Sequence, residues 1–228
     1  MAKNTVKILS DPQVGDVTFN RSVRSRSISI RVHPTKGVTV TFPYIVPYAA
    51  ARAFYQMRRD WVLETMERQK EKYKDVHMPS ADEIEALRKK AKAELPMRLS
   101  ELAKRYGFVY NRVTIKHNAT NWGSCSARSN INLNLNIVRL PKALQDYVLL
   151  HELCHLRHQD HGHGFHLLLE HVLTDNILKL MDSGDPAVPS SVEDAAYASE
   201  LARRAATSQA KYPMDHVMTR AIKTFRLV

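Results

Sequence analysis

Hydrophobic and polar residues alternate near the start of the chain with the period of two that is typical of β-strands. Residues 27–32 read Ser-Ile-Ser-Ile-Arg-Val, and residues 38–42 read Val-Thr-Val-Thr-Phe. A short segment that includes Gly37 separates the two runs. Two alternating runs around a glycine-containing loop predict a β-hairpin. We therefore expect residues 1–43 to form strands.

The following segments change to the three-to-four spacing of apolar residues that is typical of helices. Residues 48–75 show this spacing before they become polar all round, and they predict one helix. A second helix is predicted from Ser80, which precedes an acidic first turn, to the residue before Gly107, which is suited to end a helix. Pro96 lies inside that span, so we expect a kink or a restart there.

The second half of the chain mixes strands and helices. Residues 108–118 and 129–138 predict strands, and the second of these alternates Ile or Leu with Asn, as expected for a strand with one buried face. Helices are predicted from Pro141 through the histidine-rich segment, over 165–181 and over 191–210, with a linker over 183–190.

Composition and cysteine content narrow the class of protein. The 228 residues are 44% hydrophobic and 25% charged, which is ordinary for a globular protein and excludes wholesale disorder. The only two cysteines, Cys125 and Cys154, exclude a secreted disulfide scaffold and indicate a reducing compartment. No apolar segment has the length of a signal sequence or a transmembrane helix. We therefore expect a cytoplasmic protein without a membrane partner.

Histidines gather in one segment, because seven of the eleven lie within residues 151–171. Residues 151–155 read His-Glu-Leu-Cys-His, an H-E-x-x-H motif. Residues i and i+4 share one face of a helix, so both imidazoles can bind one metal ion. Glu152 follows the first of them and is placed to act as general base on a metal-bound water. The surrounding helix is strongly apolar, which favours a specific role for these polar residues.

A third ligand is expected beyond the end of this helix. His161 stands six residues after His155 and just before Gly162, where a bend can turn it back to the metal. The competing candidates are His158, His163, His166 and the Cys125 thiolate. Because of this bend we favour a site built from His151, His155 and His161. Three imidazoles leave one position of a zinc ion open for water. Cys154 is expected in the core.

Several runs together resemble one protein family. In the second half of the chain they are N-W-G-S-C-S over 121–126, the strand over 130–134, Pro141, H-E-L-C-H-L from residue 151, His161 and Phe165. In the first half they are R-S-R-S-I-S-I-R-V over 24–32, Val46-Pro47 and Trp61. Over residues 20–182 the chain is similar to the YgjP-like metallopeptidases, metal-dependent hydrolases related to SprT-like and other small zincins. The resemblance implies metal ligands at His151, His155 and His161 and a catalytic carboxylate at Glu152.

The chain also departs from this family pattern in two places. Family members commonly carry Asn and Trp where this chain has Asp160 and His166. Neither is a ligand position, so the departure concerns the polarity of the pocket and leaves the metal assignment unchanged. The run Trp122–Cys125 is expected to form a turn near the metal-binding helix.

The resemblance implies an α+β fold with a zincin-like core, in which an active-site helix lies beside a mixed or antiparallel sheet. An N-terminal β-hairpin region and a helical linker precede this core. The expected domains are strands and a helix over 1–78, the catalytic domain over 79–182 and a helical extension of undetermined role over 183–228. A strand beside the active-site helix can pair with an extended substrate backbone.

These expectations combine into a zinc-dependent hydrolase, most simply a metallopeptidase that acts on a peptide or protein. It holds one zinc ion per chain, or another divalent metal on the same ligands. The candidate substrate-binding residues are Asn132, Asn134, Tyr147 and Arg139. Hydrolysis of a nucleotide phosphoanhydride by the same metal and base is an alternative, which the lack of a glycine-rich phosphate loop disfavours.

Net charge adds a third hypothesis. The chain carries +11, and this excess lies entirely in residues 1–120, because residues 121–228 are neutral. A basic half can bind nucleic acid, and the metal site would then act on a partner bound to DNA or RNA. A solvated lysine-rich helix face around residues 88–92 accounts for part of the same charge, and no zinc ribbon, helix-turn-helix or RNP motif is visible.

Overall fold

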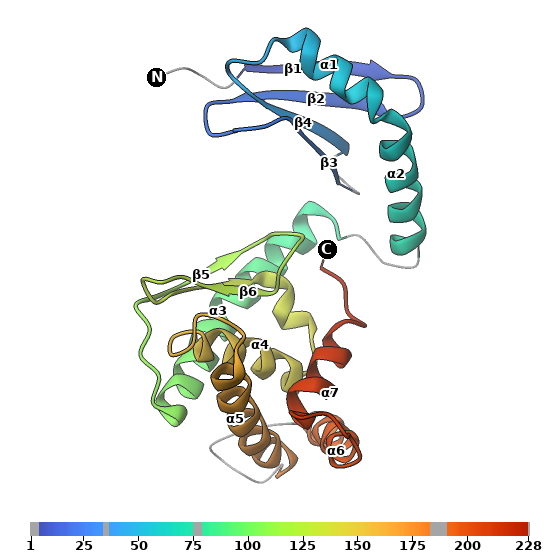
Figure 1. The fold of residues 1–228 in the computed structure, drawn as a ribbon. Coiled ribbons are helices and arrows are strands. Elements are labelled where there is room, and N and C mark those ends of the chain that lie inside the picture. Colours follow the sequence, from blue (N-terminus) through green and yellow to red (C-terminus); the bar gives the residue numbers. More distant parts are fainter. Residues whose placement is uncertain (1–4, 34–36, 75–78, 183–190, 228) are drawn as a thin grey trace. The chain divides into compact units, whose positions relative to one another are not determined.

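A computed structural model describes residues 5–33, 37–74, 79–182 and 191–227. The chain divides into two compact units, Met1–His77 and Met78–Val228. Each unit has its own cluster of buried hydrophobic residues. Over the described residues the chain is α+β, with two small sheets and seven α-helices (Figure 1). The predicted fold class is confirmed at this level.

The N-terminal unit is built on a four-stranded sheet. Its strands are β1 (Thr5–Asp11), β2 (Gly15–Ser22), β3 (Ser29–His33) and β4 (Gly37–Pro43), in the order β1-β2-β4-β3. β3 and β4 are antiparallel, with Ile30 opposite Val40 and Val32 opposite Val38. This pairing confirms the two strands of the predicted hairpin, whose connecting residues 34–36 lie outside the described part. β2 and β4 pair in parallel.

Two helices pack against the apolar side of this sheet, α1 (Tyr48–Met57) and α2 (Arg59–Tyr73). The prediction of one helix over 48–75 is wrong, because Arg58 has a φ of −106° and a ψ of 9°, outside the helical range. The apolar pattern behind that prediction includes Met57 and Trp61, which are exposed. The fully buried core contacts of the two helices come from Ala51, Tyr55 and Val62, of which only Val62 belongs to that apolar pattern.

Helix α3 (Ala81–Tyr106) opens the second unit, and both of its ends agree with the sequence pattern. The Glu83 N–H donates to the Ser80 hydroxyl at 3.2 Å, and the Ser80 N–H donates to the Glu83 carboxylate at 2.7 Å. This capping box provides acceptors for two backbone donors at the helix start. Gly107 ends the helix with a φ of 68°, a conformation that costs glycine little. The helix continues through Pro96, so no restart occurs there.

Three short strands form the sheet of this unit: β5 (Arg112–Lys116), β6 (Gly123–Cys125) and β7 (Asn130–Asn134). β7 pairs in parallel with β5 and antiparallel with β6, so the sheet is mixed and β6 is an edge strand. The strand predicted over 129–138 ends early, because Leu135–Arg139 form a 3₁₀ helix. The Asn134 side chain accepts a hydrogen bond from the Asn136 N–H at 3.0 Å, which favours this turn over a continued strand.

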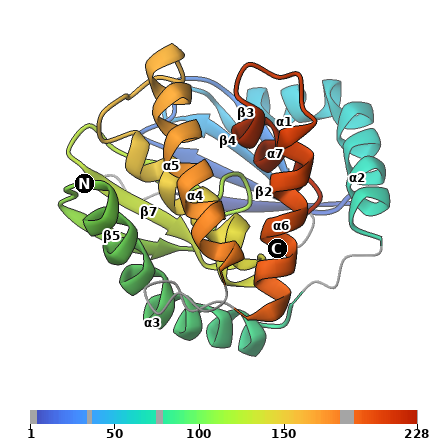
Figure 2. The same ribbon diagram turned by 90° about the horizontal axis from the view of Figure 1, so that it is seen from below.

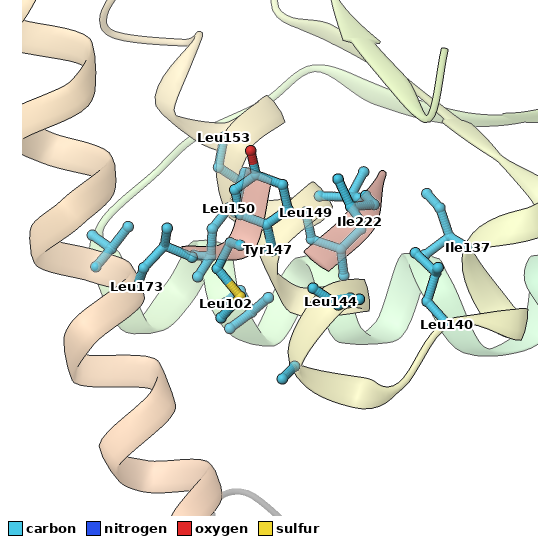
Figure 3. Packing of buried hydrophobic residues seen from close by; sticks show 14 of the residues in the cluster. Leu102, Ile137, Leu140, Leu144, Tyr147, Leu149, Leu150, Leu153, Leu173 and Ile222 are labelled. Carbon is cyan, nitrogen blue, oxygen red and sulfur yellow. The ribbon is translucent and has the colours of Figure 1, made fainter. Parts of the chain in front are cut away.

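Four further helices complete the unit: α4 (Lys142–Cys154), α5 (His163–Met181), α6 (Val192–Ala206) and α7 (Pro213–Ile222). Figure 2 shows them next to one another, and Figure 3 shows part of the core they share with α3. The sequence pattern predicted α4, α5 and α6 but not α7. The helix predicted through the histidine-rich segment ends earlier, at Cys154. The predicted linker 183–190 lies outside the described residues. Over the described part, no helix has the length and apolar character that a membrane crossing requires.

Candidate metal centre

Helix α4 holds the two histidines of the motif in a fixed position. Leu149, Leu150 and Leu153 are completely buried and attach the helix to the core. The His151 and His155 rings project on the same side, with their centroids 4.9 Å apart. The i, i+4 spacing therefore produces the shared face that the sequence predicts.

A tight turn after α4 returns the chain to these two rings. The Gly162 N–H donates to the Asp160 carboxylate at 3.2 Å, and α5 begins at the next residue. The turn places His161 Nε2 3.2 Å from His151 Nε2. Ligand atoms of His151, His155 and His161 all lie within 4.8 Å of one another. Among the described residues no other such group exists, and this one does not include His158, His163, His166 or Cys125.

Neighbouring groups orient these imidazoles. His155 Nδ1 lies 3.0 Å from the carbonyl oxygen of His158. Because a carbonyl oxygen only accepts, Nδ1 carries the proton and Nε2 keeps its lone pair for a metal. Phe165 is completely buried, stacks on His155 at 4.5 Å and meets His151 and His161 edge-on. Its ring forms an apolar floor that restricts the movement of all three histidines.

A buried polar atom and the spacing of the ring nitrogens indicate that a cation fits here. Within the described residues, Glu152 Oε2 is buried without a hydrogen-bond partner. Two nitrogen ligands at about 2.0–2.1 Å from a tetrahedral zinc ion are about 3.3 Å apart, close to the 3.2 Å between His151 Nε2 and His161 Nε2. Burial, together with His155 and His161, lowers the pKa of His151 to about 3, which keeps it in the neutral form that binds metals. The residues therefore fit zinc.

Glu152 is enclosed between α4 and β6. Its side chain is 5% exposed, and burial raises its pKa to about 8. A Cβ atom at Gly123 would lie 2.5 Å from Glu152 Oε1 and 2.7 Å from its Cγ, closer than non-bonded atoms approach. With any larger residue at 123, the Glu152 side chain would have to move from this position. The sequence prediction placed this run near the helix but missed this close contact, although glycine inside a strand often marks a close approach.

A cavity of about 260 Å³ lies beside Glu152. Its apolar lining comes from Trp122, Tyr147, Val148 and Ile222. Ile222 belongs to α7, so the C-terminal extension contributes to the wall. No Lys or Arg of the described residues lines this cavity.

Two of the four predicted substrate-binding residues lie near this cavity or on the neighbouring sheet. Tyr147 lines the cavity, and its hydroxyl lies 2.9 Å from Thr219 Oγ1. Asn132 is half-buried on β7 and donates to the Ser124 hydroxyl at 3.1 Å. Substrate contact by either residue stays a prediction.

The other two predicted residues are occupied by contacts within the protein. Asn134 is 1% exposed, and its amide nitrogen donates to the backbone carbonyls of Asn118 and Asn121. These bonds hold the loop that precedes β6. Arg139 is exposed, does not line the cavity, and donates to Asn136 Oδ1 at 3.0 Å. Their contact with substrate is likewise untested.

Both cysteines are free thiols outside the histidine cluster. Cys154 is completely buried in the core, as predicted. Cys125 is half-buried in β6, and burial together with the Glu152 charge raises its pKa. A raised pKa disfavours the thiolate, which is the form that binds metals.

Comparison with known proteins agrees with this metal centre. Residues 70–177 match the family model described as YgjP-like, metallopeptidase domain. This stretch contains all three histidines and Glu152, so the described centre lies within the part of the chain that is similar to the YgjP-like metallopeptidase domain, in agreement with the sequence motifs.

Comparisons with solved structures and with curated proteins add little to this family match. The metallopeptidase zymogen of Pyrococcus abyssi abylysin, a solved structure, is 19% identical over 40% of this chain and 94% of that chain, with a TM-score of 0.32. A TM-score of this size does not establish a shared fold. No curated protein matches the chain.

Proposed function

We propose that this chain is a zinc-dependent metallopeptidase with a zincin-like catalytic core. The observation that carries the proposal is the buried Glu152 directly beside three histidines whose ligand atoms lie within 4.8 Å of one another. His151, His155 and His161 would hold the ion. When bound, zinc supplies a Lewis acid that polarises a carbonyl and lowers the pKa of water to about 7.

Glu152 is the residue that moves the proton. Its Oε2 atom is buried without a hydrogen-bond partner among the described residues, so it is available to take up a proton beside the metal ligands. We assign it to accept a proton from the attacking water and to deliver that proton to the leaving amine. Tyr147 lines the same cavity and is our candidate donor to the substrate carbonyl oxygen, a hydrogen bond that would replace its present one to Thr219.

Two observations favour a peptide over a nucleotide as substrate. The lining of the cavity beside Glu152 contains no Lys or Arg of the described residues, and a phosphoanhydride needs cationic or backbone N–H partners. β6 is an edge strand of the sheet in the described part of the chain, and an edge strand can accept an extended peptide backbone as a further strand. Both features support hydrolysis of a peptide bond.

The nucleic-acid hypothesis has a direct test. A protein that contacts several phosphates loses affinity steeply as salt rises, because bound counterions are released. The full-length chain is applied to immobilised DNA and RNA at increasing salt. Steep loss of binding supports nucleic-acid association through the basic half. Absence of binding even at low salt removes this hypothesis and leaves the peptidase proposal unchanged.

The peptidase proposal is tested by metal content and peptide cleavage in the same preparations. We expect one zinc ion per wild-type chain and its loss in His151→Ala. Glu152→Gln should retain zinc and lose peptide cleavage by about 10²–10⁴-fold, the usual contribution of a general base. Full activity of zinc-loaded Glu152→Gln would disprove the assigned role, and zinc binding by His151→Ala equal to wild type would disprove the site.

A further inference from the structure

Helix α7 lies beyond the residues that match the family model, yet it is firmly attached to the catalytic helices. The Glu170 carboxylate of α5 accepts hydrogen bonds from the N–H groups of Met214 and Asp215, both at 2.9 Å. Backbone N–H groups in the first turn of a helix have no partner inside that helix. Glu170 therefore caps α7, and the buried Met214 and Met218 side chains join it to the shared core.

Side-chain hydrogen bonds continue this attachment from α5 through α7 to α4. His166 Nδ1 lies 2.7 Å from Asp215 Oδ2. The Thr219 hydroxyl lies 3.3 Å from Asp215 Oδ1 and 2.9 Å from the Tyr147 hydroxyl. Tyr147 stands about one turn before His151 on α4. α7 therefore fixes the tyrosine ring that lines the cavity.

The last residue of α7 reaches the cavity itself. Ile222 is 8% exposed and lines the wall together with Trp122 and Val148. Figure 3 shows Ile222 on α7 and Tyr147 on α4 in the packed region between these helices. The volume of about 260 Å³ falls below the roughly 300–1,000 Å³ of small-molecule sites. Such a cavity suits a single side chain.

We infer that this cavity receives the substrate side chain next to the scissile bond, that it selects an uncharged apolar side chain, and that Ile222 sets its depth. The inference rests on the proposed function, since it names the substrate class of that same site. The lining of described residues offers no cation for an acidic side chain, and burial of an unpaired charge is costly. Among the described residues, Glu152 is the only acidic one in this lining, and it is committed to proton transfer.

Binding is measured without turnover in the zinc-loaded double variant Glu152→Gln/Trp61→Phe. The chain has two tryptophans, so Trp122 in the cavity wall becomes the only reporter. The probes are short acetylated alanine peptides with Leu, Phe, Ala or Asp at one central position. We expect a change of Trp122 emission on binding, with Leu or Phe bound about 10-fold or more tighter than Asp.

Substitutions at Ile222 then test which residue sets the depth. In the same background, Ile222→Phe should weaken binding of the Leu peptide by about 10-fold or more, because it fills the cavity. Ile222→Ala should shift the preference from Leu toward Phe. Lys223→Phe is the matched control, because Lys223 is exposed on the neighbouring position and should leave the order of affinities unchanged. Zinc content and thermal unfolding show that each variant is folded.

The outcomes separate the two proposals. Opposite shifts from Ile222→Phe and Ile222→Ala support the inference. Suppose that the wild type cleaves peptides but all Ile222 variants bind the Leu, Phe and Asp peptides in the same order of affinity. That result overturns the inference and leaves the peptidase proposal standing. Tighter binding of Asp than of Leu also overturns the inference alone. Absence of both cleavage by the wild type and binding by the double variant overturns both.

Discussion

At the scale of single residues, the close contact between Gly123 and Glu152 gives the sharpest prediction. A side chain at 123 must displace the glutamate, because an added Cβ overlaps Oε1, Cγ and Cδ together. We expect Gly123→Ala to retain zinc and to lower kcat by about 100-fold, the typical cost of moving a catalytic group by about 1 Å. Metal analysis and peptide cleavage of the purified variant measure the two effects.

Gly15→Asn is the control for this substitution. Gly15 has no atom within 4 Å of an added Cβ, and Asn tolerates its φ of +82° better than other residues. Its cleavage activity should match that of the wild type. Unchanged activity of Gly123→Ala would show that Glu152 has room to move and would remove the proposed restriction.

These residues also show which parts of the site a sequence can predict. His151, Glu152 and His155 are predictable because a helix converts four-residue spacing into a shared face. His161 was one of several candidates, and the turn at Gly162 brings only this one to the cluster. Gly123 and Ile222 were missed, because their contacts with the site join positions far apart in the chain.

At the scale of elements, a buried ion pair attaches α4 to α3. Arg98 donates to both Asp146 carboxylate oxygens, at 2.8 and 2.6 Å, and Asn176 donates to one of them at 3.0 Å. Asp146→Ala leaves the buried Arg98 guanidinium with only the exposed Glu101 carboxylate, 3.0 Å away, as ionic partner, so we expect the free energy of unfolding to fall by about 3 kcal/mol. Urea denaturation of the zinc-free protein measures this loss.

The double variant Arg98→Met/Asp146→Leu separates two effects: the loss of the ion pair, and the cost of leaving the Arg98 charge buried without Asp146. Replacing both partners by apolar residues removes the buried charge together with its partner, and such replacements are often close to neutral. We therefore expect the double variant to unfold at a clearly higher urea concentration than Asp146→Ala. Equal midpoints would show that the loss does not come from the buried Arg98 charge that remains in Asp146→Ala.

A second polar contact joins β1 to α1 and α2 in the N-terminal unit. Arg59 donates twice to Asp11 at 2.8 Å and Tyr55 donates once at 2.9 Å; Arg59 in particular holds the pKa of Asp11 below its ordinary value. Because the folded state favours the charged form, this contribution is present above about pH 4 and decreases as pH falls through the lowered pKa. Asp11→Asn should lower stability by roughly 2 kcal/mol at pH 5–7.

The pH dependence gives the check on this contact. Thermal unfolding of wild type and Asp11→Asn is compared at pH 7, 5 and 3. We expect the difference to be constant between pH 7 and 5 and to shrink at pH 3. Asp16→Asn, at an exposed position of the same sheet, should match the wild type throughout. A difference that grows toward pH 3 would contradict the assigned sign.

Elements differ in how well the sequence predicts them, because only some are marked by residues that act within the element itself. α3 was predictable at both ends, because Ser80, Glu83 and Gly107 act within one turn. α7 was missed although Pro213 stands at its first turn and Met214, Val217, Met218, Ala221 and Ile222 follow at helical spacing. The interruption at Arg58 has no comparable local signal, since the apolar pattern runs on through exposed Met57 and Trp61.

At the scale of the whole molecule, the two units have separate hydrophobic cores, and the proposed metal site belongs to only one of them. A ligand that binds the folded form of one unit stabilises that unit by mass action. Zinc should therefore raise the unfolding transition of Met78–Val228 and leave that of Met1–His77 unchanged. At a free zinc concentration 1,000-fold above Kd the gain is about 4 kcal/mol.

The two tryptophans allow each unit to be followed separately, because Trp61 lies in the first and Trp122 in the second. Thermal unfolding is recorded by fluorescence with zinc and with a chelator, in Trp122→Phe and in Trp61→Phe. The chelator should lower only the transition that Trp122 reports, and His155→Ala in the Trp61→Phe background should show no zinc effect. An equal shift at both tryptophans would mean that the units unfold together, and no shift at Trp122 would exclude zinc from the three histidines.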